Sequence, residues 1–295
     1  MSSSVSPSPA GQKATLAAAP RWRTTRFDID LAQPRVMGIV NVTPDSFSDG
    51  GRYDSTRRAL DHAAQLLREG ADILDIGGES TRPGSPAVPL DEELRRVLPI
   101  LQEAVTWGCP VSIDTYKPEV MAAALELGVD IVNDIWALRQ PGALEVVAAH
   151  PRCGVCLMHM HREPQTMQQA PMQGDVVEQV LSFLKRCSDT IQARGVHLDR
   201  IVLDPGIGFG KTVEQNFALL AQQPRLLALG LPVLAGWSRK SSLGAVTGRE
   251  VDDRLVPSVA AAVLAVERGA RIVRVHDVRD TVAALAVWQA MAQQN

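Results

Sequence analysis

Short apolar runs alternate with longer amphipathic stretches along most of the chain. Each run is rich in Val, Ile or Leu, which is typical of strands that are buried on both faces of a parallel sheet. The runs number eight and occupy residues 36–42, 73–78, 111–115, 131–135, 155–160, 201–206, 233–238 and 272–277. The pattern therefore predicts eight short strands.

The stretches between these runs carry the periodicity of amphipathic helices. Clear examples are residues 56–70, 118–128, 176–195 and 256–270, and several reach a Gly where a helix C-cap would place one. Eight strands, each followed by its own helix, favour the α/β class and a single (β/α)8 TIM barrel. A doubly wound open sheet is the alternative.

Polar residues occupy the ends of nearly all the predicted strands. In a barrel these ends meet on one face, where active sites are built. Asp and Asn also cap helices, which accounts for one or two of these positions but not for the whole set. The predicted functional face is formed by Asn41, Asp75, Asp114, Asn133, His159, Asp204, Ser238, Arg274 and His276.

Composition limits the organisation and the partners. A Ser-, Pro- and Ala-rich leader is assigned to residues 1–25 and expected to be disordered, which leaves residues 26–295 for one barrel domain. The net charge of −3 gives no sign of a nucleic-acid or membrane partner. With no run long enough for a transmembrane helix, a cytoplasmic location is expected.

The chain has four cysteines, too few for a disulfide framework in a protein of this length. Cys153 and Cys156 form a C-x-x-C pair that could be half a zinc site or a redox pair. No second pair accompanies it, and Cys156 lies in an apolar run, so burial in a strand is the prediction.

Three aspartates and one asparagine at strand ends would place acceptors and an amide in a desolvated pocket. Asp75, Asp114, Asp204 and Asn133 require hydrogen-bond donors opposite them. A flat heterocycle with an amidine-like N–H edge supplies such donors. The pocket is therefore predicted to bind a purine-like or pterin-like ring.

Other segments predict an anion site and mobile loops. WSRKSS (237–242) places basic residues beside a helix start, where a carboxylate or phosphate would bind, unless this is only a capped helix with two solvated bases. DPGIGFGK (204–211) resembles a phosphate loop weakly, and its glycines could simply form a turn that leaves Lys211 exposed. Residues 41–51 and 81–89 look like lids.

His159 and His161 stand two apart at a strand end and could be read as metal ligands. No third ligand follows at a recognisable spacing. The preferred interpretation is a structural, hydrogen-bonded His159 in the barrel mouth and an exposed His161.

Eight segments in order resemble the motif set of the dihydropteroate synthases, and they span Met37 to Asp277. The segments are MGIVNVTPDSFSDGG, DILDIGGESTRPGS, SIDTYKP, IVNDI, LMHM, LDPGIGFGK, SRKS and RVHD. The resemblance implies a TIM-barrel transferase of folate biosynthesis, a sulfonamide target. It would condense 6-hydroxymethyl-7,8-dihydropterin diphosphate with p-aminobenzoate and release diphosphate.

The resemblance also implies a role for individual positions. The residues that it implies to be catalytic are Asp114, Lys240, Arg274, Asp75 and Arg82. The residues that it implies to bind the pterin are Asp114, Asn133, Asp204, Lys240, Arg274, Met158 and Gly236. The diphosphate would bind at Asn41, Thr81, Arg82, Arg274 and His276. The p-aminobenzoate would bind at Thr81, Pro83, Phe209, Lys240, Ser241 and Phe47.

The cofactor implied by the resemblance is Mg²⁺, with Asn41 as its protein ligand. The implied mechanism is SN1-like, with loss of diphosphate before attack by the arylamine, and the implied assembly is a homodimer. The apolar 256–266 stretch is a candidate interface. Trp237 and His161 depart from the family pattern, which affects the fit of substrates and not the reaction class.

Two rival functions share parts of this pattern. A pterin-binding barrel that transfers a methyl group from methyltetrahydrofolate needs neither a diphosphate nor an arylamine site, and the TRPGS and SRKS segments argue against it. A non-catalytic pterin-binding paralogue would have lost phosphate and lid residues, yet Arg274, His276, Asn41, Thr81 and Arg82 are all present.

Overall fold

The computed structural model describes residues 20–42, 52–81, 84–163, 166–167 and 169–294, and its centre is a ring of eight parallel strands. The strands are hydrogen-bonded in the order β8-β7-β6-β5-β4-β3-β10-β9, and a parallel bridge between Leu203 and Val233 joins the two ends. The ring contains β3 (Arg35–Asn41), β4 (Ile73–Gly77), β5 (Val111–Asp114), β6 (Ile131–Asp134), β7 (Gly154–Met158), β8 (Ile201–Asp204), β9 (Leu234–Ala235) and β10 (Ile272–Val275). The TIM-barrel prediction is confirmed, and all eight predicted strands are present.

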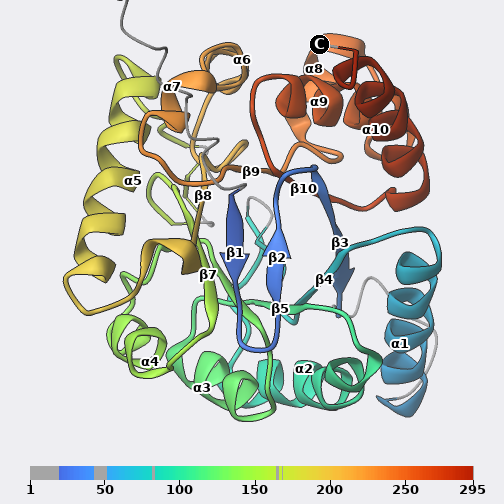
Figure 1. Ribbon diagram of the computed structural model, residues 1–295, viewed down its shortest axis with the longest axis vertical. Coiled ribbons are helices and arrows are strands. Elements are labelled where there is room, and N and C mark those ends of the chain that lie inside the picture. Colours follow the sequence, from blue (N-terminus) through green and yellow to red (C-terminus); the bar gives the residue numbers. More distant parts are fainter. Residues whose placement is uncertain (1–19, 43–51, 82–83, 164–165, 168, 295) are drawn as a thin grey trace, which may run out of the picture.

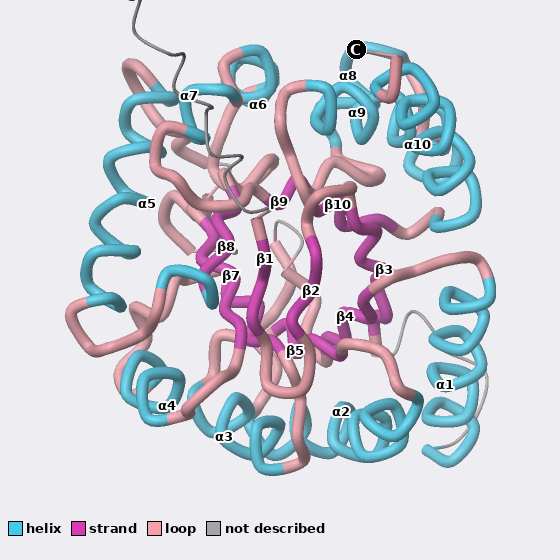
Figure 2. Tube along the Cα trace, in the orientation of Figure 1, coloured by secondary structure: helices cyan, strands magenta, loops and turns pink. Residues whose placement is uncertain are grey.

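Helices surround this ring, as Figures 1 and 2 show. They are α1 (Arg52–Arg68), α2 (Leu90–Ala104), α3 (Pro118–Glu126), α4 (Ala143–Ala149), α5 (Val176–Gln192), α6 (Val213–Ala221), α7 (Pro224–Leu227), α8 (Ser241–Thr247), α9 (Leu255–Glu267) and α10 (Val278–Ala292). The glycines expected after four of them, Gly70, Gly128, Gly195 and Gly269, all have positive φ. They therefore end the helices as the sequence predicted.

The main core fills the layer between strands and helices. Alternate strand residues face outward into it, for example Val40, Leu74, Ile113 and Val132, all with no exposed surface. The other residues of each strand face the barrel interior. This division leaves the polar residues at the carboxyl ends of the strands free to face a common opening.

A two-stranded antiparallel hairpin closes the opposite end of the barrel. It consists of β1 (Arg21–Arg23) and β2 (Asp28–Asp30) and lies across the middle of the ring in Figure 1. Trp22 is fully buried against the apolar barrel interior, and its indole N–H donates to the Arg200 carbonyl at 2.9 Å. Residues 21–25 were assigned to the leader, which is wrong. The rest of the predicted leader, up to residue 19, lies outside the described residues.

Replacing Trp22 with alanine is expected to lower the free energy of unfolding by about 3–5 kcal/mol, because a fully buried indole leaves a cavity. The KM values should stay unchanged, since the hairpin lies at the end of the barrel away from the strand-end residues. Urea unfolding measures the first effect and steady-state kinetics the second. Trp107→Ala is the matched control, because that side chain is only partly buried. An unchanged unfolding midpoint in Trp22→Ala would contradict this account.

Both members of the C-x-x-C pair are fully buried, which confirms the prediction of burial. Cys156 faces the barrel interior, whereas Cys153 Sγ lies 3.3 Å from the guanidinium of Arg200. Burial raises the pKa of both thiols. Among the helices of the described ranges, none is long and apolar enough to cross a membrane. The cytoplasmic location stays a prediction.

Candidate active site

A cavity of about 430 Å³ opens at the carboxyl ends of the strands. Twelve predicted site residues line it together: Asn41, Thr81, Asp114, Asn133, Met158, Asp204, Phe209, Gly236, Lys240, Ser241, Arg274 and His276. Asp75 lies behind the wall, with no exposed surface, and reaches the cavity only through its neighbours. Ser238 of the predicted functional face also lines the cavity, whereas His159 does not. Phe47, Arg82 and Pro83 lie outside the described residues.

An arginine held by two carboxylates forms one side of the cavity. Arg274 projects from β10, and its Nε donates to Asp75 Oδ2 at 2.6 Å while its Nη2 donates to Asp114 Oδ2 at 2.6 Å. Asn133 Nδ2 also donates to Asp75 Oδ2, at 3.1 Å. The four residues come from β10, β4, β5 and β6, so the barrel itself sets their spacing.

Burial controls the protonation of these groups. It raises the pKa of Asp114 to about 7; Arg274 opposes this shift, and Asp75 adds to it. It also raises the pKa of Asp134, at the end of β6, to about 7. Burial disfavours the charge of Arg274, but Asp75 and Asp114 outweigh it and raise its pKa. Asp114 can therefore gain or lose a proton near neutrality, depending on what binds beside it.

Asp114 and Asp134 should make the protein less stable as the pH rises from about 4 to 7. In the unfolded chain both titrate near 4, while their folded pKa values are about 7. Between these values the folded state holds protons that the unfolded state has lost, so stability falls with rising pH. Urea midpoints measured across this range should decline, and Asp114→Asn should flatten the decline. Asp61→Asn, on the exposed face of α1, is the control. A midpoint that rises with pH would contradict the prediction.

The DPGIGFGK segment forms a compact loop after β8. Asp204 Oδ1 accepts from the backbone N–H of Gly206 at 2.7 Å, and burial raises the Asp204 pKa. Further along the loop, the Lys240 ammonium lies 4.3 Å from the centre of the Phe209 ring. The expectation that Lys211 could be exposed is wrong, because the side chain is 2% exposed and its Nζ is enclosed by acceptors. The apolar stem of the residue and the curled backbone make this burial possible.

The SRKS segment brings a lysine and a serine to the start of α8. Lys240 is the N-cap residue and Ser241 the first residue of the helix, and both line the cavity. The neighbouring Arg239 has a φ of 59° and forms an ion pair with Asp277 at 2.6 Å. Both basic residues of this segment line the cavity, but the Arg239 guanidinium is paired with Asp277, whereas the Lys240 ammonium lies over the Phe209 ring.

Other lining residues offer groups suited to a phosphate. His276 is fixed by Ser238, whose Oγ lies 2.9 Å from Nδ1 and accepts from the His276 backbone N–H at 3.1 Å. Asn41 ends β3, lines the same cavity and is half-buried. Within the described ranges, no group of three or more His, Cys, Asp or Glu side chains is placed to hold a metal ion. A single amide oxygen fits Mg²⁺ that arrives bound to a diphosphate and keeps its waters.

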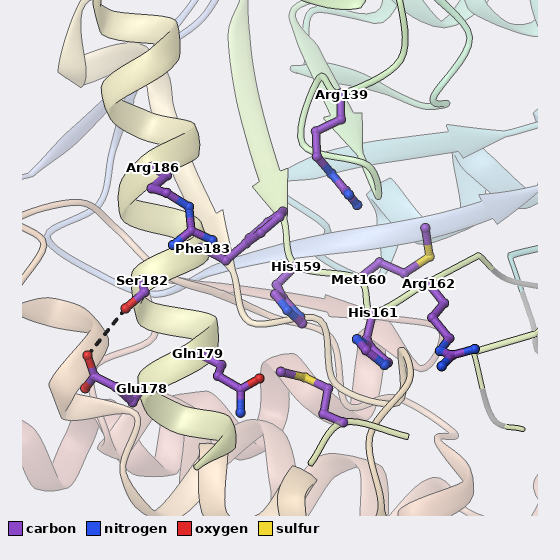
Figure 3. A pocket seen from close by; sticks show the side chains of 11 residues that line it. Arg139, His159, Met160, His161, Arg162, Glu178, Gln179, Ser182, Phe183 and Arg186 are labelled. Carbon is purple, nitrogen blue, oxygen red and sulfur yellow. Dashed lines mark hydrogen bonds between the residues drawn. The ribbon is translucent and has the colours of Figure 1, made fainter. Parts of the chain in front are cut away.

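His159 and His161 do not act as a pair. His159 is buried, and its Nδ1 lies 2.9 Å from Lys211 Nζ, so its interpretation as a structural residue is confirmed. His161 was expected to be exposed, which is wrong, because the loop that carries Gly210 covers part of it. Both line a second hollow of about 380 Å³, shown in Figure 3 with Arg139, Arg162 and Arg186.

Several residues of the main cavity were missed. Ile135 and Met167 form an apolar cluster with the predicted Met158 and Phe209, which gives one wall a hydrophobic surface. Ile135 stands two residues after Asn133 in the predicted strand end, and this spacing could have indicated it. Met167 and Arg254 carry no local signal, because each reaches the cavity from a loop or a helix start distant in sequence.

A model of the family described as pterin binding enzyme matches residues 37–276. This range begins in β3 and ends one residue after β10, so it includes every strand of the ring. The fold and the acceptor-rich cavity accordingly define a barrel enzyme of the pterin-binding class.

Individual relatives narrow the class. A dihydropteroate synthase from Neisseria meningitidis serogroup B is 51% identical over 276 residues, which is 92% of this chain and 97% of the relative. The structure of the Xanthomonas albilineans dihydropteroate synthase with 4-aminobenzoic acid is 51% identical, with a TM-score of 0.88 over 93% of this chain and 99% of that one. The structure of the Burkholderia cenocepacia dihydropteroate synthase complexed with 7,8-dihydropteroate is 49% identical, with a TM-score of 0.84 over 94% of this chain and 99% of that one. The chain belongs to the dihydropteroate synthase family.

Proposed function

We propose that the cavity described above is where this chain condenses 6-hydroxymethyl-7,8-dihydropterin diphosphate with p-aminobenzoate. The observation that carries the proposal is the gathering of twelve expected site residues around one opening of about 430 Å³. They come from six strands, one helix and the loops that follow the strands, so a chance grouping is a poor explanation. Relatives of about 50% identity are described with 4-aminobenzoic acid and with 7,8-dihydropteroate, which supports both substrates.

The pterin would bind deep in the cavity. Asp114, Asn133 and Asp204 offer buried acceptors and one amide to its N–H edge. The apolar wall of Ile135 and Met158 suits one face of the ring. Arg274 would cover the other face, since a planar guanidinium stacks well on a flat ring. Asp75 would act through Arg274 and Asn133, whose positions it fixes.

The diphosphate would lie at the rim near Asn41, Thr81, Arg274 and His276, all of which line the cavity. Arg82 would join them from outside the described residues. Asn41 would hold Mg²⁺, which when bound neutralises part of the charge that builds up on the leaving diphosphate. Donors placed at a developing anion lower the barrier for its departure.

The p-aminobenzoate would bind between Phe209, Lys240 and Ser241. Ser241 and the first backbone N–H groups of α8 would receive its carboxylate, and Phe209 would pack on its ring. Thr81 lines the same opening, while Pro83 and Phe47 complete the predicted set from outside the described residues.

The proposed reaction is SN1-like. The bond between the pterin methylene and oxygen breaks, and its electron pair leaves with the diphosphate. The cation that remains is delocalised over the pterin and lies near Asp114. The neutral arylamine nitrogen then forms the new C–N bond and afterwards loses a proton to solvent or diphosphate. A strong base is not required, because an aromatic amine is already neutral at pH 7.

The test is to incubate the purified protein with the pterin diphosphate, p-aminobenzoate and Mg²⁺, and to measure dihydropteroate and diphosphate. Equal amounts of both products are expected. Omitting p-aminobenzoate should prevent dihydropteroate formation, and a sulfonamide should compete with p-aminobenzoate. Pterin binding without either product would contradict the proposal, and methyl transfer from methyltetrahydrofolate would then be tested.

We also propose that the enzyme is a homodimer formed through α9 and α10. These helices expose apolar side chains that a monomer would leave in water: Val256 is 74% exposed and Val287 73% exposed. Leu264 and Met291, on the same two helices, are also exposed. Light scattering should give twice the chain mass, and Val256→Asp with Val287→Asp should reduce it to one. A wild-type monomer at micromolar concentration would contradict the dimer.

A further inference from the structure

A lysine that none of the proposed roles uses is enclosed beside the cavity. Lys211 is 2% exposed, and its Nζ donates to the carbonyl oxygens of Gly206 at 2.7 Å and Phe209 at 3.1 Å. Its Nζ also lies 2.9 Å from His159 Nδ1, and the His159 carbonyl is further away at 3.4 Å. The three shortest contacts match the three protons of an ammonium group.

The partner of Lys211 on β7 is suited to accept a proton. Burial lowers the pKa of His159 to about 2, and the charge of Lys211 adds to the effect. The imidazole is therefore neutral, and its Nδ1 can accept from the ammonium. The centre of its ring lies 4.8 Å from the centre of the Phe183 ring of α5 in a T-shaped arrangement, and Figure 3 shows the two side chains beside each other.

The loop from Asp204 to Lys211 presses directly on the chain after β7. Gly206 and Gly210 both have positive φ, and a Cβ added to Gly206 would lie 1.8 Å from the His159 carbonyl oxygen. A Cβ added to Gly210 would lie 2.6 Å from the His161 carbonyl oxygen. The carbonyl oxygens of Gly206, Phe209 and His159 converge on Lys211 Nζ. The first two also accept from the backbone N–H groups of Phe209 and His161, and Lys211 adds a second donor to each.

The same loop carries side chains for both proposed substrate sites. Gly206, which Lys211 holds through its carbonyl, donates its N–H to the Asp204 carboxylate at 2.7 Å. Phe209, also held through its carbonyl, places its ring 4.3 Å from the Lys240 ammonium. The position of Lys211 therefore determines how a pterin-binding carboxylate and an arylamine-binding ring lie relative to each other.

We propose that Lys211 is a positioning residue for the condensation, which fixes the DPGIGFGK loop against His159 and so sets the relative placement of the two substrates. This inference rests on the proposed function. Lys211 touches neither substrate and acts through Asp204 and Phe209. An error of about 1 Å in such a placement can cost as much as 100-fold in rate.

The charge of Lys211 is finely balanced. Burial lowers its pKa to about 7; the charge of Asp204, at the end of β8, opposes this shift, and the charge of Lys240, the N-cap residue of α8, adds to it. His159 and His161, which follow β7, are the other titratable groups near it, and the charge of Arg139 contributes to the low pKa of His159. Above pH 7 the neutral amine has two protons for three close acceptors. The loop should then be held less firmly, so the KM for p-aminobenzoate should rise with pH.

The first test is Lys211→Met, which keeps an unbranched apolar side chain and removes the donors. At pH 7 we expect kcat/KM for p-aminobenzoate to fall at least about tenfold in folded enzyme, and the rise of KM with pH to disappear. Lys185→Met, at an exposed lysine of α5, is the matched control and should behave as wild type. Wild-type kcat/KM in folded Lys211→Met would overturn the proposal, as would an unchanged pH profile.

The second test changes His159, the partner of Lys211, and remains informative if Lys211→Met fails to fold. His159→Asn places an acceptor near the position of Nδ1, whereas His159→Leu does not. We expect His159→Leu to lower kcat/KM for p-aminobenzoate by about tenfold and His159→Asn to restore most of it. Equal loss in both variants would show that only packing matters and would overturn the proposal. A wild-type chain that forms no dihydropteroate would instead contradict the proposed function.

Discussion

Lys240→Ala should lower kcat/KM by at least about 10³-fold, which corresponds to roughly 4 kcal/mol of transition-state binding. Lys240 is the N-cap residue of α8, its ammonium lies 4.3 Å from the centre of the Phe209 ring, and its charge lowers the pKa of Asp204 against the effect of burial. In the proposed arrangement it touches both substrates. A hydrogen bond to a charged group contributes about 1.5–3 kcal/mol, so the loss of one at each substrate accounts for the expected effect.

Two further variants make this result specific. Lys185→Ala removes an exposed lysine that is paired with Asp189, and it should leave the kinetics unchanged. Lys240→Arg keeps the charge and should therefore recover part of the activity. Recovery should be incomplete, because the longer side chain meets the close wall formed by Gly208. Dihydropteroate formation in a coupled or chromatographic assay gives kcat and KM for both substrates. Activity within tenfold of wild type in Lys240→Ala would remove the residue from the catalytic set.

Arg274→Met should lower the free energy of unfolding by about 3–5 kcal/mol and also abolish turnover. The substitution leaves two buried carboxylates, Asp75 and Asp114, without the cation that they share, and an unpaired buried charge is costly. Without Arg274 the pKa of Asp114 should rise further, since that arginine opposes the effect of burial. Protonation would then relieve the cost, so the destabilisation should be larger at pH 8 than at pH 6.

The double variant Arg274→Met with Asp75→Asn separates stability from catalysis. Removing one carboxylate along with the arginine should restore part of the unfolding free energy. It should not restore dihydropteroate formation, because the group proposed to contact the pterin and the diphosphate is still missing. Urea unfolding at pH 6 and pH 8 and a product assay measure the two effects. If Arg274→Met were as stable as wild type at pH 8, the ion pairs of Arg274 with Asp75 and Asp114 would not stabilise the fold, which would contradict the prediction.

The strand pattern was predictable because burial on both faces leaves a compositional mark. The runs 131–135 and 201–206 begin with two or three apolar residues, Ile and Val among them, and place Asn or Asp directly after these, and the structure has a strand in each. The common direction of parallel strands then brings Asp114, Asn133 and Asp204 to one opening with no further information needed. The site residues that were found from sequence are mostly of this kind.

What escaped prediction depends on contacts between distant segments. The strand Arg21–Arg23 is too short to show a period, and only its packing against Arg200 and the barrel interior identifies it. From the sequence alone, Lys211 is expected to be a solvent-exposed lysine. In the fold, His159 and the loop carbonyls surround its ammonium group. Met167 reaches the cavity only through the packing of its own loop. Such long-range contacts cannot be predicted from the local sequence.

The hairpin that closes the bottom of the barrel can dock only late during translation, because its partners lie far along the chain. Its partners are Asp130, Gly154 and Arg200, so it cannot dock until about two thirds of the chain has left the ribosome. Strand β3 waits longer still, because one of its edges pairs with β10 at residues 272–275. The first strand of the ring to be synthesised is thus the last to be fully paired. A nascent chain that stalls before Ile272 would present the hydrogen-bonding edge of β3 to its neighbours, which makes chaperone capture of such chains the expected cellular outcome.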